Sequence, residues 1–343
     1  MIQIEIIIPI FNSEETIERT LNSICSASKG FEKFKVICVD DGSKDKSLNI
    51  VKKFKSKLSN NIYILSTGGT GLGPGIARNK GLNYCSKDSY IIFLDSDDEL
   101  SENSLSIVSE KIIEYKNPEL LAMNYELNES ESINPVRRKK LNKGNRRDQS
   151  KLASTKDSLV TSYLKMQMDG SVIFTVFQAK FLKTEKITFR NGLHEDIDFI
   201  FNCYLKAKNL IYCDYIFYKK HSTSSSIINT FSTLHINGYL NAWFNIYKII
   251  KNFDFQNKLG LKEKEIESAF LTGFRGAVGV LIKNTDWSEI NYGEAISYIC
   301  NLIRQNEEIL NLLILQNKCT FITEYDKLYE IIHNVLIQDG KST

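Results

Sequence analysis

The chain has 343 residues, of which 42% are hydrophobic and 25% charged, and its formal net charge at pH 7 is +3. This balance is typical of a soluble globular protein, and the charge is too small to indicate binding to nucleic acid. No apolar run approaches the roughly 18 residues that a membrane-spanning helix needs. Met1 leads directly into a strand pattern instead of a signal peptide, so we expect a cytoplasmic protein.

The cysteines and one basic segment bear on where the protein acts. Seven cysteines are scattered without a C-x-x-C pair, which favours free, buried thiols over disulfides or a zinc site. Residues 137–151 carry eight lysines and arginines against the single acid Asp148. Such a segment is either a solvated loop or a contact with an anionic acceptor or with the inner face of the cell membrane, and both interpretations stay open.

Strands and helices alternate in the first part of the sequence. Buried-strand patterns occupy residues 2–10, 34–39 and 62–65. A helix pattern at 45–58 separates the second strand from the third, and this alternation predicts an α/β fold with a mostly parallel sheet. Right-handed crossovers bring the carboxyl ends of parallel strands to one edge of the sheet. Asp40 and Asp41 end the second strand and should lie at that edge.

A glycine-rich segment follows the third strand. Residues 68–81 read GGTGLGPGIARNKG, and a helix begins within them. Glycines let the backbone approach a ligand closely, and a helix N-terminus directs free N–H groups at an anion. Neither the dinucleotide-binding fingerprint nor the P-loop spacing fits. Arg78 and Lys80 at the helix start could pair with a diphosphate, whereas a merely flexible loop is the other interpretation.

The next buried strand, residues 90–94, ends in carboxylates. It is followed by Asp95, Ser96, Asp97, Asp98 and Glu99. Acids gathered in this way repel one another unless a cation neutralises them, and oxygen ligands suit Mg²⁺ or Mn²⁺. An isolated Asp-x-Asp more often closes a strand as an ordinary polar loop, so the predicted metal site depends on the neighbouring motifs.

The rest of the chain changes character near residue 230. Helix patterns cover 101–115, 154–168 and 195–207, and strand patterns cover 120–125, 172–178 and 210–219. From residue 234 onward the pattern is helical throughout. We therefore predict an α/β domain at 1–228 and an all-α domain at 229–343. Aromatic residues recur at helical spacing in the second domain, which indicates either a buried core or a surface that forms a homo-oligomer or binds an acceptor.

Five motifs occur in an order that is known from one protein family. They are IIIPIFN at 6–12, VDDGS at 39–43, GPGIARNKG at 73–81, LDSDD at 94–98 and ED at 195–196. Together they resemble the family 2 glycosyltransferases, which adopt the GT-A fold and transfer a sugar from a nucleotide-sugar donor. The resemblance covers about the first 225 residues and does not extend into the helical remainder.

The resemblance implies roles on the nucleoside side of a donor site. Pro9, Phe11 and either Glu14 or Glu15 would border the nucleoside. Asp41 would accept a hydrogen bond from the imide of the base, with Asp40 as its neighbour. An imide N–H facing a carboxylate suits uracil, so a UDP-sugar is the expected donor.

The resemblance also implies roles around the diphosphate. Asp95 and Ser96 would lie near the ribose, and Asp97 would hold the Mn²⁺ or Mg²⁺ that bridges the two phosphates. Gly75 and Arg78 would approach the diphosphate from the glycine-rich segment.

One further residue has an open role. His221 could complete the shell of the ion or touch the β-phosphate, but family members often carry arginine in this region, and a solvated loop histidine fits as well.

Catalysis requires a base for the acceptor. By its match to the acid that ends the Glu-Asp motif, Asp196 is the predicted general base, and Glu195 would bind the acceptor or orient the base. A carboxylate that takes the proton of a poor hydroxyl nucleophile typically contributes about 10²–10⁴-fold in rate. Direct attack on the opposite face of the sugar predicts inversion. The alternative is that these residues, with Asp198, are ordinary first-turn acids of a helix.

We therefore expect a metal-dependent, inverting hexosyl- or N-acetylhexosaminyltransferase. Its acceptor would be a glycan, a lipid-linked glycan or a glycoprotein, in the synthesis of bacterial surface polysaccharide. A catalytically inactive protein that binds a nucleotide-sugar or acts as a scaffold is one alternative. A sugar nucleotidyltransferase is another, but that class carries its glycine-rich loop directly after the first strand, where this chain has residues 9–12 reading PIFN.

Overall fold

The computed structural model describes residues 2–58, 61–129, 155–168, 171–222, 233–284 and 292–315, and the single residue 334. The chain forms two compact units. Unit 1 comprises Met1–Asn145, Leu152–Ser154 and Gly170–Thr223, and unit 2 comprises the remaining residues. The basic segment 137–151 lies outside the described residues. Each unit has its own core and is considered separately below.

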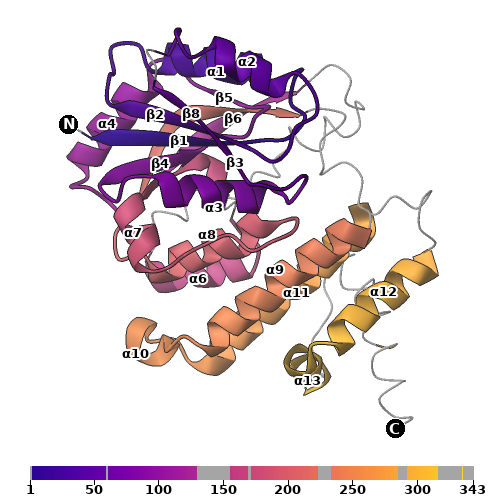
Figure 1. The fold of residues 1–343 in the computed structure, drawn as a ribbon. Coiled ribbons are helices and arrows are strands. Elements are labelled where there is room, and N and C mark those ends of the chain that lie inside the picture. The colour runs from indigo at the N-terminus through magenta and orange to yellow at the C-terminus, as the bar shows by residue number, and fades with distance from the viewer. Residues whose placement is uncertain are drawn as a thin grey trace. The chain divides into compact units, whose positions relative to one another are not determined.

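Unit 1 is built on an eight-stranded sheet in the described part of the chain (Figure 1). Its strands are β1 (Gln3–Ile10), β2 (Phe34–Asp40), β3 (Ile62–Ser66), β4 (Ser89–Phe93), β5 (Glu99–Leu100), β6 (Leu120–Glu129), β7 (Thr175–Gln178) and β8 (Leu210–Ser222). Their order in the sheet is β3-β2-β1-β4-β7-β6-β8-β5. Strands β3, β2, β1 and β4 pair in parallel, as the alternating pattern predicts, and β6 pairs in parallel with β8. Strands β7 and β5 run antiparallel to their neighbours. The predicted α/β class is confirmed.

Helices cover both faces of this sheet. They are α1 (Ile17–Ala27), α2 (Ser47–Lys53), α3 (Pro74–Tyr84), α4 (Ser104–Glu114), α7 (Ala179–Thr184) and α8 (Glu195–Lys206), with a 3-10 turn η2 (Val172–Phe174) before β7. Helices α1 and α2 lie on one face, and α3, α7 and α8 lie on the other (Figure 1). The central strand β1 is therefore buried from both sides, and Ile6, Ile7 and Ile8 are fully inaccessible to solvent.

The carboxyl end of β1 is where the sheet opens. Strand β1 pairs with β2 as far as Ile10 and Asp40, but with β4 only as far as Ile7 and Phe93. Pro9, which has no N–H group to donate, lies beyond the last pair with β4, so it costs no ladder hydrogen bond on that side. Neighbouring strands that diverge at their carboxyl ends leave room for a ligand, as at the switch points of open α/β sheets.

Strand β8 differs from its prediction. The pattern at 210–219 predicts short strands followed by a polar loop, whereas β8 is one strand of 13 residues, Leu210–Ser222. It pairs with β6 along its length, with a register shift between Ala122 and Asn124. Residues 219–222 are polar, and it is the pairing with β6 that keeps them extended. The short elements β5 and α7 were also not predicted, because they are too short to show a period.

Unit 2 is helical in its described part, which confirms the predicted all-α character. Its helices are α6 (Lys156–Leu164), α9 (Thr233–Lys251), α10 (Phe255–Leu259), α11 (Glu263–Asn284), α12 (Tyr292–Arg304) and α13 (Glu307–Leu315). Helix α6 belongs to this unit although it lies within residues 1–228 of the sequence. Trp243 of α9 packs against Phe270 and Phe274 of α11, and all three rings are buried. No described helix is long and apolar enough to cross a membrane.

Candidate active site

Two loops at the carboxyl edge of the sheet are fastened to each other. Asn12 Oδ1 accepts a hydrogen bond from Lys44 N at 2.9 Å, and Glu14 Oε2 accepts one from Lys46 N at 2.9 Å. In return, Glu14 N donates to Asp45 Oδ2 at 2.9 Å. The structure therefore uses the carboxylate of Glu14, a predicted nucleoside neighbour, to order the backbone that leads into α2. The two loops next to Pro9 and Phe11 are therefore held in place by hydrogen bonds within the protein itself.

Asp40 shapes the turn that follows β2. Its carboxylate accepts hydrogen bonds from Gly42 N at 3.2 Å and Ser43 N at 3.1 Å, which is an Asx-type turn. Gly42 has φ +82°, and a Cβ atom there would lie 2.5 Å from the carbonyl oxygen of Gly69. Only glycine fits this position, so the turn and the glycine-rich loop are packed directly on each other.

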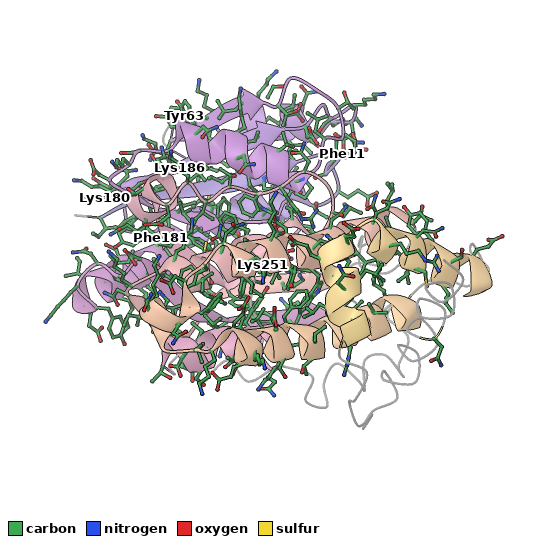
Figure 2. The ribbon with its side chains drawn as sticks, turned by 90° about the horizontal axis from the view of Figure 1, so that it is seen from below. Phe11, Tyr63, Lys180, Phe181, Lys186 and Lys251 are labelled. Atoms are coloured by element: carbon green, nitrogen blue, oxygen red, sulfur yellow. The ribbon has the colours of Figure 1, made fainter. Side chains whose placement is uncertain are left out.

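Asp41 holds the glycine-rich loop. Its Oδ1 accepts a hydrogen bond from Thr67 Oγ1 at 2.7 Å and its Oδ2 accepts one from Gly73 N at 2.8 Å. Each carboxylate oxygen keeps a second lone pair, so the predicted contact of Asp41 with a base stays compatible with this geometry. Phe11, with 45% of its surface exposed, reaches toward Gly71 and lies at the surface of unit 1 (Figure 2). An exposed ring beside this loop offers a flat surface to a base.

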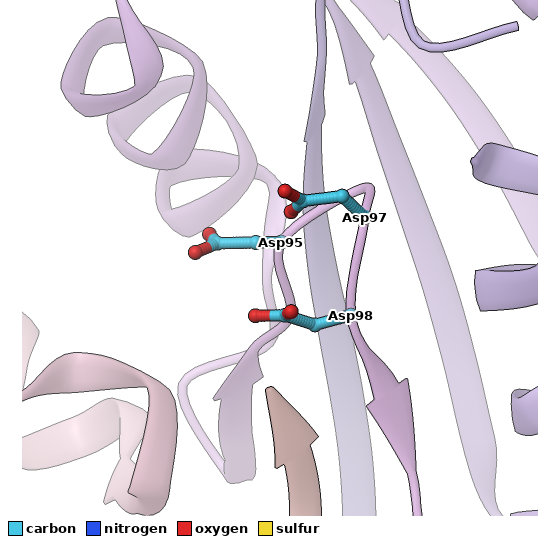
Figure 3. A group of neighbouring side chains, drawn as sticks. All are labelled: Asp95, Asp97 and Asp98. Atoms are coloured by element: carbon cyan, nitrogen blue, oxygen red, sulfur yellow. The ribbon is translucent and has the colours of Figure 1, made fainter. Parts of the chain in front are cut away.

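The acidic loop after β4 brings three carboxylates together (Figure 3). One oxygen each of Asp95, Asp97 and Asp98 lies within 4.8 Å of the others. Asp98 is almost fully buried, and its two oxygens accept hydrogen bonds from Tyr218 Oη and His221 N, both at 2.7 Å. Tyr218 Oη also accepts a hydrogen bond from Asp95 N at 3.2 Å. Strand β8 thus supplies donors that fix the shape of the loop.

The donor set of this loop fits a hard divalent cation. Burial raises the pKa of Asp97, and the charge of Asp95 raises it further. Burial and the charges of Asp95 and Asp97 raise the pKa of Asp98 to about 7. Burial is the larger cause of both shifts, and repulsion between the ionised acids adds to it; Mg²⁺ or Mn²⁺ with its preference for oxygen ligands would offset both effects. Asp98 is already occupied by its two donors, so Asp95 and Asp97 have the freer oxygens.

Helix α1 anchors the backbone of the acidic loop. The carbonyl oxygen of Ser96 accepts hydrogen bonds from Thr16 Oγ1 and Thr20 Oγ1, both at 2.9 Å. The side-chain hydroxyl of Ser96 lies 2.8 Å from the hydroxyl of Ser13. Arg19 donates to the carbonyl oxygen of Asp97. Ser96, which is predicted to contact the donor, makes these contacts to the protein itself.

Arg78 joins the acidic loop to helix α8. Its Nη2 donates to Asp95 Oδ1 at 2.7 Å, and its Nη1 donates to Glu195 Oε1. The guanidinium is 5% exposed and lies over the ring of Phe189, 5.5 Å from its centroid. Burial alone would lower its pKa, but the charges of Asp95 and Glu195 outweigh that effect and raise it. Both terminal nitrogens therefore hold carboxylates, whereas the sequence predicts that they contact the diphosphate.

The rest of α3 packs on the segment that leads into α8. A Cβ atom at Gly75 would lie 2.7 Å from the carbonyl oxygen of Arg190 and 2.8 Å from Glu195 Cγ. Asn79 Nδ2 donates to Phe189 O at 2.8 Å, and Phe189 N donates to Asn79 Oδ1 at 2.9 Å. Gly75, which is predicted to approach a diphosphate, thus also allows α3 to approach α8 closely.

The first turn of α8 carries three acids in different surroundings. Glu195 pairs with Arg78, and burial raises its pKa to about 7 although the charge of Arg78 opposes this. Asp198 is buried and pairs with Arg190 Nε at 3.0 Å. Asp196 is half-buried at the helix start. Ion pairs therefore account for Glu195 and Asp198, whereas Asp196, the predicted base, forms no ion pair at 4.0 Å or less with the residues that the structure describes.

Asp196 belongs to the same electrostatic environment as the acidic loop. Burial raises its pKa, while the positive charges of Arg78 and Lys220 lower it and the charge of Asp95 raises it. A carboxylate with a raised pKa is a stronger base than an ordinary aspartate when ionised. The structure thus brings the predicted base and the predicted metal ligands within electrostatic range of one another.

His221 does not face the acidic loop with its ring. Its Nε2 lies 2.6 Å from Glu99 Oε1, and Glu99 also lies 3.5 Å from Arg19 Nε on α1. Only its backbone N–H reaches the loop, at Asp98. Sequence reasoning missed Tyr218 and Lys220 of β8. Extending the strand through residue 222 with its period of two would have placed both side chains on one face.

Comparisons with known proteins agree with this architecture. The model of Glycosyl transferase family 2 matches residues 5–167. The poly(ribitol-phosphate) beta-glucosyltransferase of Bacillus spizizenii is 32% identical over 225 residues, which are 63% of this chain and 32% of that protein. The minor teichoic acid biosynthesis protein GgaA of Bacillus subtilis is 44% identical over 105 residues, which are 30% of this chain and 23% of that protein. The chain matches a third or less of the length of these relatives.

A solved structure has the same fold. It is the crystal structure of S. aureus TarS 1–349 in complex with UDP-GlcNAc, which matches with a TM-score of 0.67 and 20% sequence identity and covers 92% of this chain and 84% of that one. The five motifs in family order and the matching model show that residues 5–167 are similar to glycosyl transferase family 2, and unit 1 has the GT-A fold.

Proposed function

We propose that this protein is an inverting glycosyltransferase that moves a sugar from a UDP-sugar to a hydroxyl of a bacterial surface glycan. The match of residues 5–167 to the family model supports the reaction type. The name of one relative specifies teichoic acid biosynthesis, and the name of another specifies poly(ribitol-phosphate). A polyol-phosphate polymer is therefore the first acceptor to examine, ahead of the glycolipid or glycoprotein acceptors of the wider family.

One observation carries the proposal. Arg78 binds Asp95 of the acidic loop with one terminal nitrogen and Glu195 of α8 with the other. The first turn of α8, which carries Asp196, is thereby tied to a loop whose carboxylates suit a divalent ion, and the charge of Asp95 acts on Asp196. A base next to a cation site is the arrangement that sugar transfer from a diphosphate needs, because one end of the reaction loses a proton while the other gains negative charge.

The chemistry of the chain follows from these positions. A bond forms between the acceptor oxygen and the anomeric carbon, the bond from that carbon to the phosphate oxygen breaks, and its electron pair leaves with the diphosphate. Asp196 takes the proton of the acceptor hydroxyl, and Glu195, fixed by Arg78, keeps the base in place. A divalent ion held by Asp95 and Asp97 would supply charge stabilisation for the departing diphosphate. Attack opposite the leaving group inverts the anomeric carbon.

A donor and acceptor panel tests the proposal. We expect purified protein with Mn²⁺ to release UDP from at least one of UDP-glucose, UDP-galactose and UDP-GlcNAc when poly(ribitol phosphate) is present. Chelation should remove this turnover, and NMR of the product should show an inverted anomeric centre. Silence across all donors and acceptors, or a retained configuration, contradicts the proposal.

The two alternatives make different predictions. A catalytically inactive binding protein would bind UDP without any turnover in this panel. A sugar nucleotidyltransferase would join a sugar phosphate to UTP, and its glycine-rich loop follows the first strand, whereas here that loop follows β3. The assay distinguishes them by whether UDP, diphosphate or nothing is released.

Two expectations about partners complete the proposal. We place the enzyme in the cytoplasm at the inner face of the membrane, with residues 137–151 as the contact with anionic lipid. We also propose that the helices of unit 2 form a homo-oligomer. Sedimentation with anionic vesicles tests the first, and analytical ultracentrifugation of the whole chain tests the second.

A further inference from the structure

The direction of side chains along β8 singles out one lysine. Tyr218 directs its hydroxyl to Asp98 at 2.7 Å, so its side chain lies on the face of the acidic loop. Successive side chains of a strand point to opposite faces, and β8 stays paired with β6 through Ser222. Lys220 therefore shares the face of Tyr218. His221 lies on the other face, where its ring meets Glu99.

Lys220 is a cation among carboxylates. Its side chain is partly buried. Its charge acts on Asp97 and on Asp196, since it lowers the pKa of both against the effect of burial. Within the described residues its ammonium group forms no ion pair at 4.0 Å or less, whereas both terminal nitrogens of Arg78 are bound to carboxylates. Lys220 is thus the basic side chain here that remains free to bind an incoming anion.

We propose that Lys220 binds the phosphate oxygens of the donor and stabilises the diphosphate as it leaves, the role that the family resemblance implies for Arg78 and leaves open for His221. This inference rests on the proposed function. Lysine suits the task because its ammonium group is a compact charge with three donors on a flexible stem. The residue exchanges no proton in the reaction. Its two carboxylate neighbours keep the ammonium at the site until the donor arrives.

The proposal predicts changes of opposite sign for two ligands. Loss of the lysine charge makes the acidic loop more negative, so Mn²⁺ alone should bind more tightly. The same loss removes a charged hydrogen bond to phosphate, so UDP should bind more weakly. A general disturbance of the site would weaken both, and this difference separates the proposed role from a merely structural one.

The experiment measures both ligands on the same variants. Lys220→Met and Lys220→Gln are compared with wild type and with Lys219→Met, which removes a lysine from the opposite face of the same strand. Mn²⁺ binding is followed by the EPR signal of the free ion, and UDP binding by calorimetry at a Mn²⁺ concentration that saturates every variant. We expect the Lys220 variants to bind UDP about 10-fold or more weakly and Mn²⁺ about 2- to 5-fold more tightly. Lys219→Met should match wild type.

The outcomes are separable. Wild-type affinity for UDP in folded Lys220 variants overturns the inference, and so does weaker binding of both ligands. Using two substitutions guards against a folding defect in one of them, and thermal melting identifies such a defect. If the wild-type protein itself binds no UDP, the proposed function fails, whereas UDP binding that is insensitive to Lys220 rejects only the role of this lysine.

Discussion

Individual carboxylates in this site differ by what they touch. Asp98 accepts hydrogen bonds from Tyr218 and from the backbone of His221, Asp95 and Glu195 share Arg78, and Asp196 keeps none of these partners. Sequence motifs mark all of these acids equally. The distinction between acids that are held by protein partners and an acid that is not comes from the neighbours, which lie far away in the chain.

The shared arginine should be essential for stability. Arg78→Met leaves Asp95 and Glu195 without their buried counter-charge, and removal of one partner of a buried pair costs about 3–5 kcal/mol. We expect a loss of this size in urea unfolding at pH 7. Lys111→Met is the control, since Lys111 forms only an exposed pair with Glu114 and should cost about 0–1 kcal/mol. Equal stability of the two variants contradicts the bridging role.

Stability should fall as the pH rises toward neutrality. In the folded protein the pKa of Asp98 and that of Glu195 are each raised to about 7. The unfolded chain releases these protons near pH 4, so their stabilising contribution is full below about pH 4 and is lost as the pH rises through 7. Urea unfolding without divalent ions should show higher stability at pH 5.5 than at pH 8. Mn²⁺ should reduce the difference, and an unchanged difference would count against the cation site.

At the scale of elements, helix α3 connects the parts of the site. Gly73, the residue before its first turn, is held by Asp41, its second turn carries Arg78, and the Asn79 side chain donates to and accepts from the backbone of Phe189. The loops after β2 and β4 and the start of α8 therefore depend on one rigid helix. An active site built on such an element keeps its geometry better than one built on loops alone.

The two hydrogen bonds between the side-chain amide of Asn79 and the backbone of Phe189, here called the amide clamp of α3, can be tested with a matched pair of variants. Asn79→Ala removes two hydrogen bonds to Phe189 and should cost about 1–3 kcal/mol of stability. It should also lower kcat more than it changes KM, because the start of α8 would then be held by Arg78 without the support of the segment at Phe189. Asn83→Ala changes an exposed residue of the same helix and should stay within about 0.5 kcal/mol of wild type. Similar effects of both variants would argue against the clamp.

Strand β8 shows where local sequence information ends. Strands β1, β2 and β4 follow from apolar runs, and their acids from the motifs that close them. The polar end of β8 resembles a loop, because its extended form depends on β6, a partner about 90 residues away in the chain. The family resemblance made His221 a candidate ligand, whereas the strand directs its ring to Glu99 and puts Lys220 on the face of Tyr218.

This difference predicts a small effect of His221 on the metal site. His221→Ala removes a ring that lies against Glu99 and leaves the backbone donor to Asp98 in place. We expect Mn²⁺ affinity within about 2-fold of wild type, and a loss of about 10-fold or more in Asp97→Asn, since only the latter removes a proposed ligand. A large loss of Mn²⁺ affinity in His221→Ala would restore the histidine as a ligand.

For the whole molecule, the sequence predicted the resemblance to family 2 glycosyltransferases and the fold of unit 1, and it predicted the helical character of unit 2. It placed α6 within the first domain, whereas this helix belongs to unit 2. Gly273 of α11 explains the packing, since a Cβ atom there would lie 1.7 Å from the carbonyl oxygen of Leu164 at the end of α6. Such a contact between distant segments leaves no periodic signal in the sequence.

The most direct test of the account is the turnover of Asp196→Asn beside its UDP affinity. If Asp196 is the base, kcat should fall by about 10²–10⁴-fold while UDP binds as in wild type. Asp88→Asn, an exposed acid that precedes β4 at the opposite end of that strand, should change neither quantity. Turnover of Asp196→Asn at the wild-type rate would contradict the central claim that the structure brings a base on α8 to the acidic loop.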